Sequence, residues 1–392
     1  MPGLGAGSAG RRSPTGGATL RVLVCTVVHH PQDARILHRQ IRAMLDAGYS
    51  VTYAAPFSAC NTEPWPELTA VDLPRAVGRA RGEALRAARR MLRTHGHEVD
   101  VVLLHDPELL LVLPGLDIPG AVVWDVHEDT SAALIAKRWL PGLLRPLARM
   151  GVRMVEDRAE RSLRLILAEE GYRNRFRHIH PVVPNTTYVP ENVSTAGDDR
   201  VVYVGHLAAA RGVDVMVETA RHLAGSGLTV DVVGHADGHS RGALRAAQDN
   251  GWLRWHGFVP NDKAMAFLDG AMCGLSLLQD LPNYRHSMPT KVLEYMAHGV
   301  PVVTTPLPAA VSLMQVHRCG VVVPFDDPEA TAAAVLRLHR DAALRTSMGL
   351  RGHQAARVGY HWPDTAQEFL TRIESWAQAA RPRPCLTLGT TL

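Results

Sequence analysis

The stretch HSMPTKVLEYMAHGVPVV, residues 286–303, contains one complete unit of the pattern that decides the fold. Its first part predicts a short helix with a strongly apolar side, for which Ser287 is suited to the N-cap and Pro289 to the first turn. Gly299-Val-Pro then ends the helix, because glycine and proline both interrupt helical hydrogen bonding. The apolar run that follows predicts a buried strand.

The same alternation of apolar strand and amphipathic helix runs along most of the chain. Continuous Val, Ile and Leu strands separated by helices predict parallel sheets that are covered on both faces. The predicted strands are 20–28, 51–56, 100–105, 121–126 and 163–168, and then 201–206, 228–235, 253–258, 273–278, 301–305 and 320–324. The fold class is therefore α/β, with two Rossmann-like, doubly wound domains that face a central cleft.

Composition predicts the domain boundaries. The Gly/Ser/Ala-rich N-terminus predicts a disordered tail and lacks the apolar core of a signal peptide. A polar, proline-bearing segment at 181–199 has no periodicity and predicts the linker. The chain then divides into a tail (1–19), a first Rossmann-like domain (20–195), a second Rossmann-like domain (196–360), a terminal helix (361–380) and a tail (381–392).

The overall composition excludes several classes of protein. A hydrophobic content of 46% with 20% charged side chains is typical of a globular protein, and no run reaches the ~20 apolar residues of a membrane helix. The five cysteines are scattered without a CxxC pair, which predicts buried thiols in a reducing, cytoplasmic setting. The histidines do not group at metal-ligand spacing, so we expect no metal site.

Lys291 and Glu294 raise a question of chemistry, because they stand three residues apart on the helix of the opening stretch. A helical ion pair of a few tenths of a kcal/mol would account for them. However, Val292, Leu293 and Met296 predict a largely buried helix, where charged groups are costly unless they serve a ligand. The pattern favours a ligand.

Glycines end three strands of the second domain. Gly205 follows one strand and Arg211 precedes the next helix, which is an arrangement suited to phosphate. Gly234 and the pair Gly257-Phe258 end two further strands. Each glycine alone would be explained by a tight turn, but three at one edge favour a nucleotide pocket.

Acidic and histidine side chains follow three strands of the first domain. His127 stands at the end of one strand, in the sequence WDVHEDT. A single histidine in such a place is more often a satisfied core residue. Acidic neighbours at three successive strand ends raise the odds of an active site. The candidates are Asp33, Arg35, His105, Asp106, His127 and Glu128.

At this point the chain resembles glycosyltransferase family 4, over roughly residues 20–380. The resemblance rests on HPxDxRIxxxxxxLxxxGYxVT, DVHED, YVGxLxxxRG, HGFVP and, above all, PTKVLEYMAHGVPVV. It implies the GT-B fold, with a first domain on the acceptor side, a second domain that binds a nucleotide sugar, and a terminal helix that crosses back to the first domain. It also implies transfer with retention of anomeric configuration.

The resemblance implies a role for each matching residue. Glu294 would accept hydrogen bonds from the donor ribose, Arg211 and Lys291 would face the diphosphate, and His127 would contact the transferred sugar. The other implied donor-side residues are Gly205, His206, Gly234, Gly257, Phe258, His286, Pro289 and Thr290. The implied acceptor-side residues are Asp33, Arg35, His105, Asp106 and Glu128.

Two positions depart from the family pattern. His206 stands where members usually carry an arginine, which leaves Arg211 and Lys291 to hold the phosphates. His286 stands where a glutamate that contacts the sugar is common, so the identity of the sugar is open.

The function implied is a metal-independent, retaining glycosyltransferase without a cofactor, which moves a sugar, with a UDP-sugar favoured, to an acceptor hydroxyl. We expect it in polysaccharide, glycolipid or natural-product biosynthesis. Three alternatives stay open: a pseudo-glycosyltransferase, a nucleotide-sugar epimerase, and a non-catalytic donor-binding partner subunit. A dehydrogenase is disfavoured, because no GxGxxG follows the first strand of either half.

The acceptor is a glycan, a lipid-linked molecule or a small molecule, and no nucleic-acid partner is expected. Within 75–93 there are seven arginines against Glu83 alone, and the apolar side of this predicted helix could lie on the inner face of an anionic membrane. KRWLPGLLRPLARM, residues 137–150, is a second candidate. An ordinary amphipathic helix packed on its sheet explains the first segment equally well.

Overall fold

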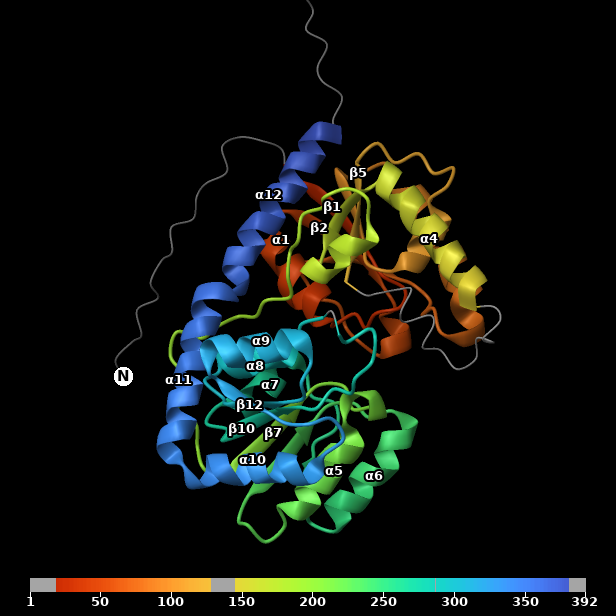
Figure 1. Ribbon diagram of the computed structural model, residues 1–392. Helices are drawn as coiled ribbons and strands as arrows, with labels where there is room; N and C mark the ends of the chain where they lie inside the picture. Colours follow the sequence, from red (N-terminus) through yellow and green to blue (C-terminus); the bar gives the residue numbers. More distant parts are fainter. Residues whose placement is uncertain (1–18, 128–144, 286, 381–392) are drawn as a thin grey trace, which may run out of the picture.

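The computed structural model describes residues 19–127, 145–285 and 287–380, and Figure 1 shows them as an upper and a lower domain. Each domain is built on one six-stranded parallel sheet. The strands of the first sheet are β1 (Arg21–Cys25), β2 (Ser50–Ala55), β3 (Thr69–Asp72), β4 (Val101–Leu104), β5 (Ala121–Val126) and β6 (Arg164–Leu167). Those of the second are β7 (Arg200–Val204), β8 (Thr229–Val233), β9 (Arg254–Trp255), β10 (Cys273–Ser276), β11 (Val302–Thr304) and β12 (Gly320–Val322).

The two sheets have the same topology. Their strand orders are β3-β2-β1-β4-β5-β6 and β12-β11-β10-β7-β8-β9, so β1 pairs with β4 as β7 pairs with β10. This is the Rossmann order, in which a crevice opens beyond the carboxyl ends of the strands where the order reverses. The predicted fold class is therefore confirmed.

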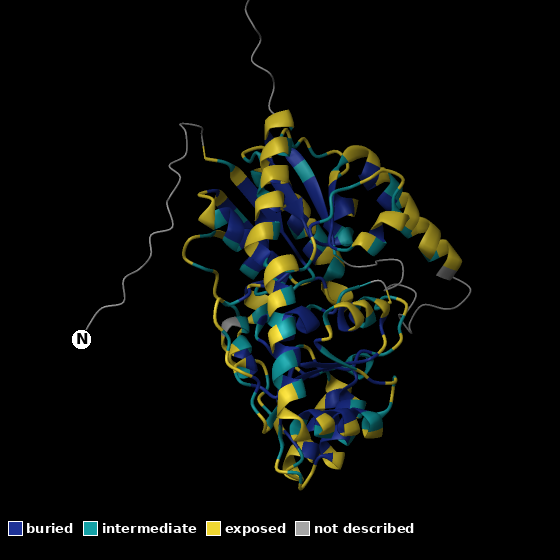
Figure 2. Cartoon of the chain, turned by 60° about the vertical axis from the view of Figure 1, so that its left-hand side comes forward, coloured by how far each residue is buried: buried dark blue, intermediate teal, exposed yellow. Residues whose placement is uncertain are grey.

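Helices cover both faces of the sheets. In the first domain they are η1 (Ala34–Ile41), α1 (Arg42–Asp46), η2 (Ser58–Cys60), η3 (Gly78–Ala80), α2 (Arg81–His95), η4 (Pro107–Val112), α4 (Arg145–Ser162) and η6 (Glu170–Arg175). In the second they are η7 (Ala209–Arg211), α5 (Val213–His222), α6 (Gly238–Asp249), α7 (Asn261–Met265), η8 (Ala266–Leu268), α8 (Thr290–Ala297), α9 (Pro308–His317), α10 (Pro328–Arg340), α11 (Ala342–Gly359) and α12 (Trp362–Ala380). Most of the strands between them are buried, as Figure 2 shows, whereas β3, β9 and β12 at the sheet edges are partly exposed.

The last helix, α12, runs from the second domain along the first (Figure 1). Its apolar side enters the hydrophobic core of the first domain, where Trp362, Phe369 and Ile373 are buried against strand residues such as Val22 and Val24. Tyr49 also donates a 2.6 Å hydrogen bond to Glu374. The first domain therefore draws part of its core from the far end of the chain.

The structure corrects the predicted start of α8. The helix begins at Thr290, so Pro289 is the N-cap residue and its side chain cannot cap. The hydroxyl of Ser287 instead donates to the carbonyl oxygens of Asn283 and Tyr284. The predicted capping role of Ser287 is wrong, because the turn before the helix uses its hydroxyl.

The arginine-rich helix, α2, packs against the first sheet. Its apolar side chains Ala84, Ala88, Met91 and Leu92 are buried in the core beside strands β1 and β4. An apolar side that packs on the sheet is not free to enter a membrane. The prediction of a membrane-binding face on α2 is therefore wrong.

Within the described ranges, no helix combines the length and apolar character that a membrane crossing requires.

Candidate active site

The carboxyl ends of the two sheets face each other across the molecule. The ring of His30, after β1, lies 5.8 Å from the ring of Phe258, after β9. The amide of Met288, just before α8, donates a 3.2 Å hydrogen bond to the carboxylate of Glu169, just after β6. The strand ends of both domains therefore border one cleft, where the Rossmann topology places ligands.

Lys291 lies beneath the second-domain side of this cleft. Its side chain is buried, its Nζ donates a 2.9 Å hydrogen bond to the hydroxyl of Tyr203, and Nζ lies 4.1 Å from the centre of that ring. A Cβ on Gly205 would lie 3.4 Å from the same Nζ, so the backbone at the end of β7 adjoins the amine. Burial lowers the pKa of Lys291 well below its usual value, and the charge of Arg211 lowers it further.

The glycine-ended turns come together as one edge. The amide of Gly205 donates to Val233 at 2.9 Å, and that of Gly234 donates to Gly257 at 2.8 Å. Gly205 and Gly234 have φ angles of 139° and 146°, and a Cβ on Gly234 would lie 1.8 Å from the carbonyl oxygen of Gly205. The close approach of these turns requires glycine.

Arg211 and His206 add basic groups beside Lys291. Arg211 ends η7, and Gly212 separates it from the start of α5. Its charge lowers the pKa of both His206 and Lys291. Burial lowers the pKa of His206, and Arg211 and His235 lower it further, so His206 favours the neutral form. The imidazoles of His206 and His235 stack with centroids 6.0 Å apart. A fixed guanidinium and a buried amine at glycine turns form a site suited to phosphate.

Glu294 contacts the first domain. Its carboxylate accepts a 3.4 Å hydrogen bond from Nη2 of Arg39, which belongs to η1 of the first domain. Both residues line a pocket of about 420 Å³ between the domains. Lys291 and Glu294 thus have separate partners, and an ion pair between the two does not account for their presence.

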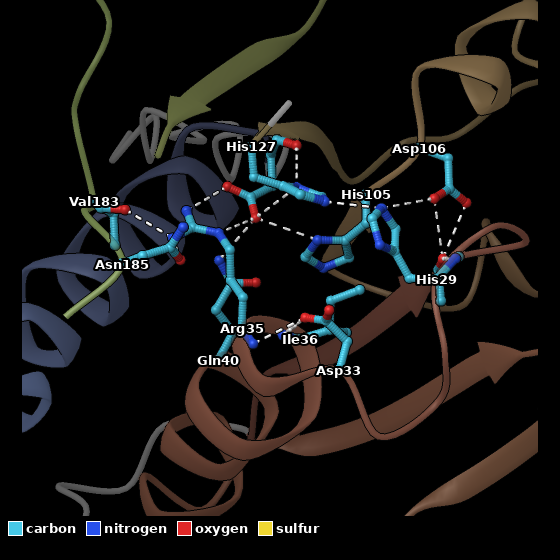
Figure 3. A network of polar contacts seen from close by, with 12 residues as sticks. His29, Asp33, Arg35, Ile36, Gln40, His105, Asp106, His127, Val183 and Asn185 are labelled. Carbon is cyan, nitrogen blue, oxygen red and sulfur yellow. Dashed lines mark hydrogen bonds and ion pairs between the residues drawn. The ribbon is translucent and has the colours of Figure 1, made fainter. Parts of the chain in front are cut away.

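Asp125, the fifth residue of β5, organises the first-domain side of the cleft. Arg35 donates to both of its oxygens at 2.7 Å, and Gln40 donates to Oδ2 at 3.1 Å. The same guanidinium donates to Val183 and Asn185 (Figure 3). Although burial alone would raise the pKa of Asp125, the charge and hydrogen bonds of Arg35 hold it well below its usual value. Asp125 is therefore a buried, fixed anion.

His127 is oriented by this anion. Its Nδ1 lies 3.1 Å from the carbonyl oxygen of Asp125 and 3.5 Å from Oδ2. Both oxygens are acceptors, so Nδ1 carries the proton. In the neutral ring Nε2 then carries a lone pair and can accept a hydrogen bond. Burial lowers the pKa of His127, but the bond and charge of Asp125 outweigh it and raise the pKa.

His29, after β1, completes a chain of acidic and basic groups (Figure 3). Its Nε2 lies 2.9 Å from Nε2 of His127 and 3.4 Å from Oδ1 of Asp106. Because Nδ1 carries the proton of the neutral His127 ring, Nε2 of His127 accepts in this contact and Nε2 of His29 donates. Asp106 in turn accepts from the hydroxyl of Thr26 and the amide of Val28.

The predicted acceptor-side residues lie mostly behind the cleft surface. Asp33 caps η1 by accepting from the amides of Arg35 and Ile36. Asp106 and His105 have exposed fractions of 0% and 1%, and burial lowers the pKa of His105 to about 4. These side chains support the loops that carry His29 and His127. Glu128 and His286 lie outside the described residues.

His105, Asp125 and His127 offer ligand atoms within 4.8 Å of one another, as a metal centre requires. Arg35 already engages both oxygens of Asp125, however, and its positive charge disfavours a second cation at the same carboxylate. Hydrogen bonding and ion pairing account for this cluster.

Glu169 is a site residue that the sequence reasoning missed, together with His29, Arg39 and Asp125. It contacts the second domain through Met288, and burial raises its pKa to about 7 against the opposing effects of that amide and Arg35. Its only sequence signal was its place directly after a predicted strand.

Comparison with known proteins agrees with this architecture. Residues 198–341 match the family described as glycosyl transferases group 1. Alpha-D-kanosaminyltransferase of Streptomyces kanamyceticus is 32% identical over 154 residues, which is 38% of this chain and 39% of that protein. The chain spans less than half the length of the curated relatives it matches.

Two solved structures show the fold over nearly the whole chain. Sucrose-phosphate synthase from Thermosynechococcus elongatus covers 92% of this chain and 100% of its own, with a TM-score of 0.73 and 16% identity. Anabaena HepE in complex with UDP and glucose covers 91% and 100%, with a TM-score of 0.67 and 12% identity. The second domain therefore matches the group 1 glycosyltransferases, and the two facing Rossmann sheets have the GT-B fold of these solved structures.

Proposed function

We propose that the chain is a retaining glycosyltransferase that moves a sugar from a nucleoside diphosphate sugar to an acceptor hydroxyl. The observation that carries the proposal is the buried amine of Lys291 beside the turn of Gly205, with the charge of Arg211 close by. A diphosphate is the ligand chemistry that compensates two cationic groups at the end of a strand.

The other side chains fit the rest of such a donor. The carboxylate of Glu294 suits the two hydroxyls of a ribose, and the exposed ring of Phe258 suits the flat edge of a base. His127, held by Asp125, supplies a polar group at the first-domain side for the transferred sugar.

Transfer requires one bond to break and one to form on the same face of the sugar. The bond from the anomeric carbon to the diphosphate breaks, and the acceptor oxygen bonds to that carbon. The acceptor proton passes to the leaving diphosphate, whose negative charge Lys291 and Arg211 stabilise. Catalysis then consists of positioning and charge stabilisation.

Donor identity is tested by a thermal-shift screen of UDP-, GDP-, ADP- and dTDP-sugars, followed by detection of the transferred sugar. UDP-sugars come first, because the similarly folded HepE was solved with UDP and glucose. The names of the curated relatives, which include a kanosaminyltransferase and a D-inositol 3-phosphate glycosyltransferase, make small hydroxylated molecules the first acceptors to test.

Arg211→Ala and Glu294→Ala are expected to abolish transfer while the fold persists. The matched control is Arg221→Ala, an exposed arginine of the same domain that pairs with Glu218. Near-full turnover by both site variants would overturn the proposal.

A lipid-linked acceptor at the inner face of an anionic membrane is the second part of the proposal, and α4 supports it. Leu147, Met150 and Met154 are exposed at spacings of three and four residues, which places them on one side of the helix. Arg149 and Arg153 are exposed beside them. Of the second candidate segment, 137–150, residues 137–144 lie outside the described residues.

Flotation with anionic vesicles at low and high salt tests this contact. We expect the protein to bind the vesicles in a salt-sensitive way. The double variant Arg149→Glu with Arg153→Glu should remove this binding. The double variant Arg86→Glu with Arg90→Glu on α2 should leave it intact. Absence of salt-sensitive flotation would contradict the membrane contact and favour a soluble acceptor.

A further inference from the structure

Arg39 and Glu294 form a contact between the two domains. Arg39 belongs to η1, Glu294 to α8, and 255 positions separate them in the sequence. Their side chains are only 7% and 13% exposed, so both charges are largely removed from water. Such groups need a partner, because an uncompensated buried charge is strongly unfavourable.

The geometry of this pair differs from that of a purely structural one in the same helix. One turn earlier, Arg35 makes two bonds of 2.7 Å to Asp125 and engages both oxygens. Arg39 makes a single 3.4 Å bond, longer than the usual range, and this bond involves only Oε1 of Glu294. The contact therefore restrains the carboxylate through Oε1 alone, and Arg39 makes no hydrogen bond to Oε2.

The pair opens onto a pocket of suitable size. The volume of about 420 Å³ falls within the range of small-molecule sites. Besides Arg39 and Glu294 its walls include Trp65, Tyr188, Asn261 and Met265. A carboxylate with one oxygen engaged by Arg39, on the wall of such a cavity, suits the two adjacent hydroxyls of a ribose.

We propose that Arg39 is a positioning residue for the nucleoside end of the donor, which holds the Glu294 carboxylate ready for the ribose diol. This inference rests on the proposed function and assigns part of the donor site to the first domain. Nucleotide binding then depends on contact between the domains as well as on the second domain.

Binding measurements by titration calorimetry test the proposal. The probes are UDP, or GDP or ADP if the donor screen selects that base, the matching 2′-deoxy nucleoside diphosphate, and inorganic pyrophosphate. Arg39→Met is expected to weaken UDP binding by about tenfold or more and to leave pyrophosphate binding unchanged. The preference for the ribose over the deoxyribose form should shrink as well, and Arg39→Lys should restore part of the affinity.

The control is Arg86→Met. Arg86 is an exposed arginine of the same domain that lies outside the pocket and donates to the carbonyl oxygen of Gly82, so its loss should leave UDP affinity unchanged. Wild-type UDP affinity in Arg39→Met would overturn the proposal, and so would an equal loss for UDP and pyrophosphate. Failure of the unmodified protein to bind any nucleoside diphosphate would instead overturn the proposed function, and this inference with it.

Discussion

Two arginine–aspartate pairs of the first domain have the same contact distance and very different surroundings. Nη2 of Arg35 lies 2.7 Å from Oδ1 of Asp125, and Nη2 of Arg42 lies 2.7 Å from Oδ1 of Asp46. The side chains of the first pair are 5% and 0% exposed, whereas those of the second are 36% and 61% exposed. The pairs therefore separate the effect of burial from that of geometry.

Asp125→Asn is expected to lower the free energy of unfolding by about 3–5 kcal/mol, because it leaves a buried guanidinium without its counter-charge. Asp46→Asn should change it by about 0.5 kcal/mol or less. Urea unfolding of both variants at pH 7 measures the difference. Equal effects of the two substitutions would contradict the assignment of Asp125 as the anchor of the network.

Lys291 predicts a proton uptake on ligand binding. Burial and Arg211 lower its pKa in the free protein, and an arriving diphosphate raises it again. UDP binding should therefore take up a proton and weaken as pH rises, which titration calorimetry in buffers of different ionisation enthalpy measures. Lys291→Met should remove the uptake, whereas the exposed Lys263→Met should retain it. An uptake that persists in Lys291→Met would count against this assignment.

At the residue scale, the sequence pointed to the second-domain side more readily than to the first. Lys291 stood out because a charged residue in a predicted buried helix needs an explanation. Asp125 carries the same signal inside the apolar run AVVWDV, where it interrupts a predicted buried strand. Arg39 gave no such signal, because its partner Glu294 comes from the other domain.

At the scale of elements, the start of α8 is held to the first domain by Glu169. Its folded-state pKa of about 7 stands above the ordinary 4.5, so the native protein binds the extra proton between these values. The contribution of Glu169 to the free energy of unfolding is therefore fully present below pH 4.5. It falls as the pH rises to about 7 and stays low at higher pH.

Glu169→Gln should therefore raise the melting temperature at pH 8 and change it little at pH 4.5, since a neutral side chain has no charge to bury. Thermal unfolding at the two pH values measures this difference. Glu170→Gln is the matched control, because its side chain is 69% exposed and pairs with Arg173. A shift in the Glu169 variant that is equal at both pH values would contradict the assignment.

Most elements could be predicted from the sequence because their signal is local. The apolar runs that became β1, β4, β5 and β7 read as buried strands without any tertiary information. The stretch 253–258 is different, since only Arg254–Trp255 pairs as a strand. Gly257, with a φ of 68°, leaves the extended conformation there. A strand end set by backbone conformation leaves little trace in an apolar pattern.

At the scale of the whole molecule, α12 makes the first domain depend on the C-terminal region. Phe369 is fully buried in the first-domain core, so Phe369→Ala should cost about 3–5 kcal/mol. Hydrogen exchange should rise in β1 and β4 while β7 and β8 stay protected. The neighbouring Glu368→Ala, at an exposed position, should alter neither. Increased exchange confined to the second domain would contradict this account.

The relation between the domains could not be predicted in detail. Patterning predicts each sheet separately, but the contacts of Met288 with Glu169 and of His30 with Phe258 depend on how the sheets are placed against each other. No local pattern encodes that placement, because it results from surfaces more than a hundred residues apart in the sequence.

The path of α12 also bears on synthesis. A ribosome releases the chain from its N-terminus, and domains usually fold in that order. Here the first domain lacks Trp362, Phe369 and Ile373 until α12 has been made, which is after the whole second sheet. The strands of the second sheet are complete once β12 has emerged. The second domain can therefore form its hydrophobic core before the first domain has all of its core residues. The domain made first is the one finished last.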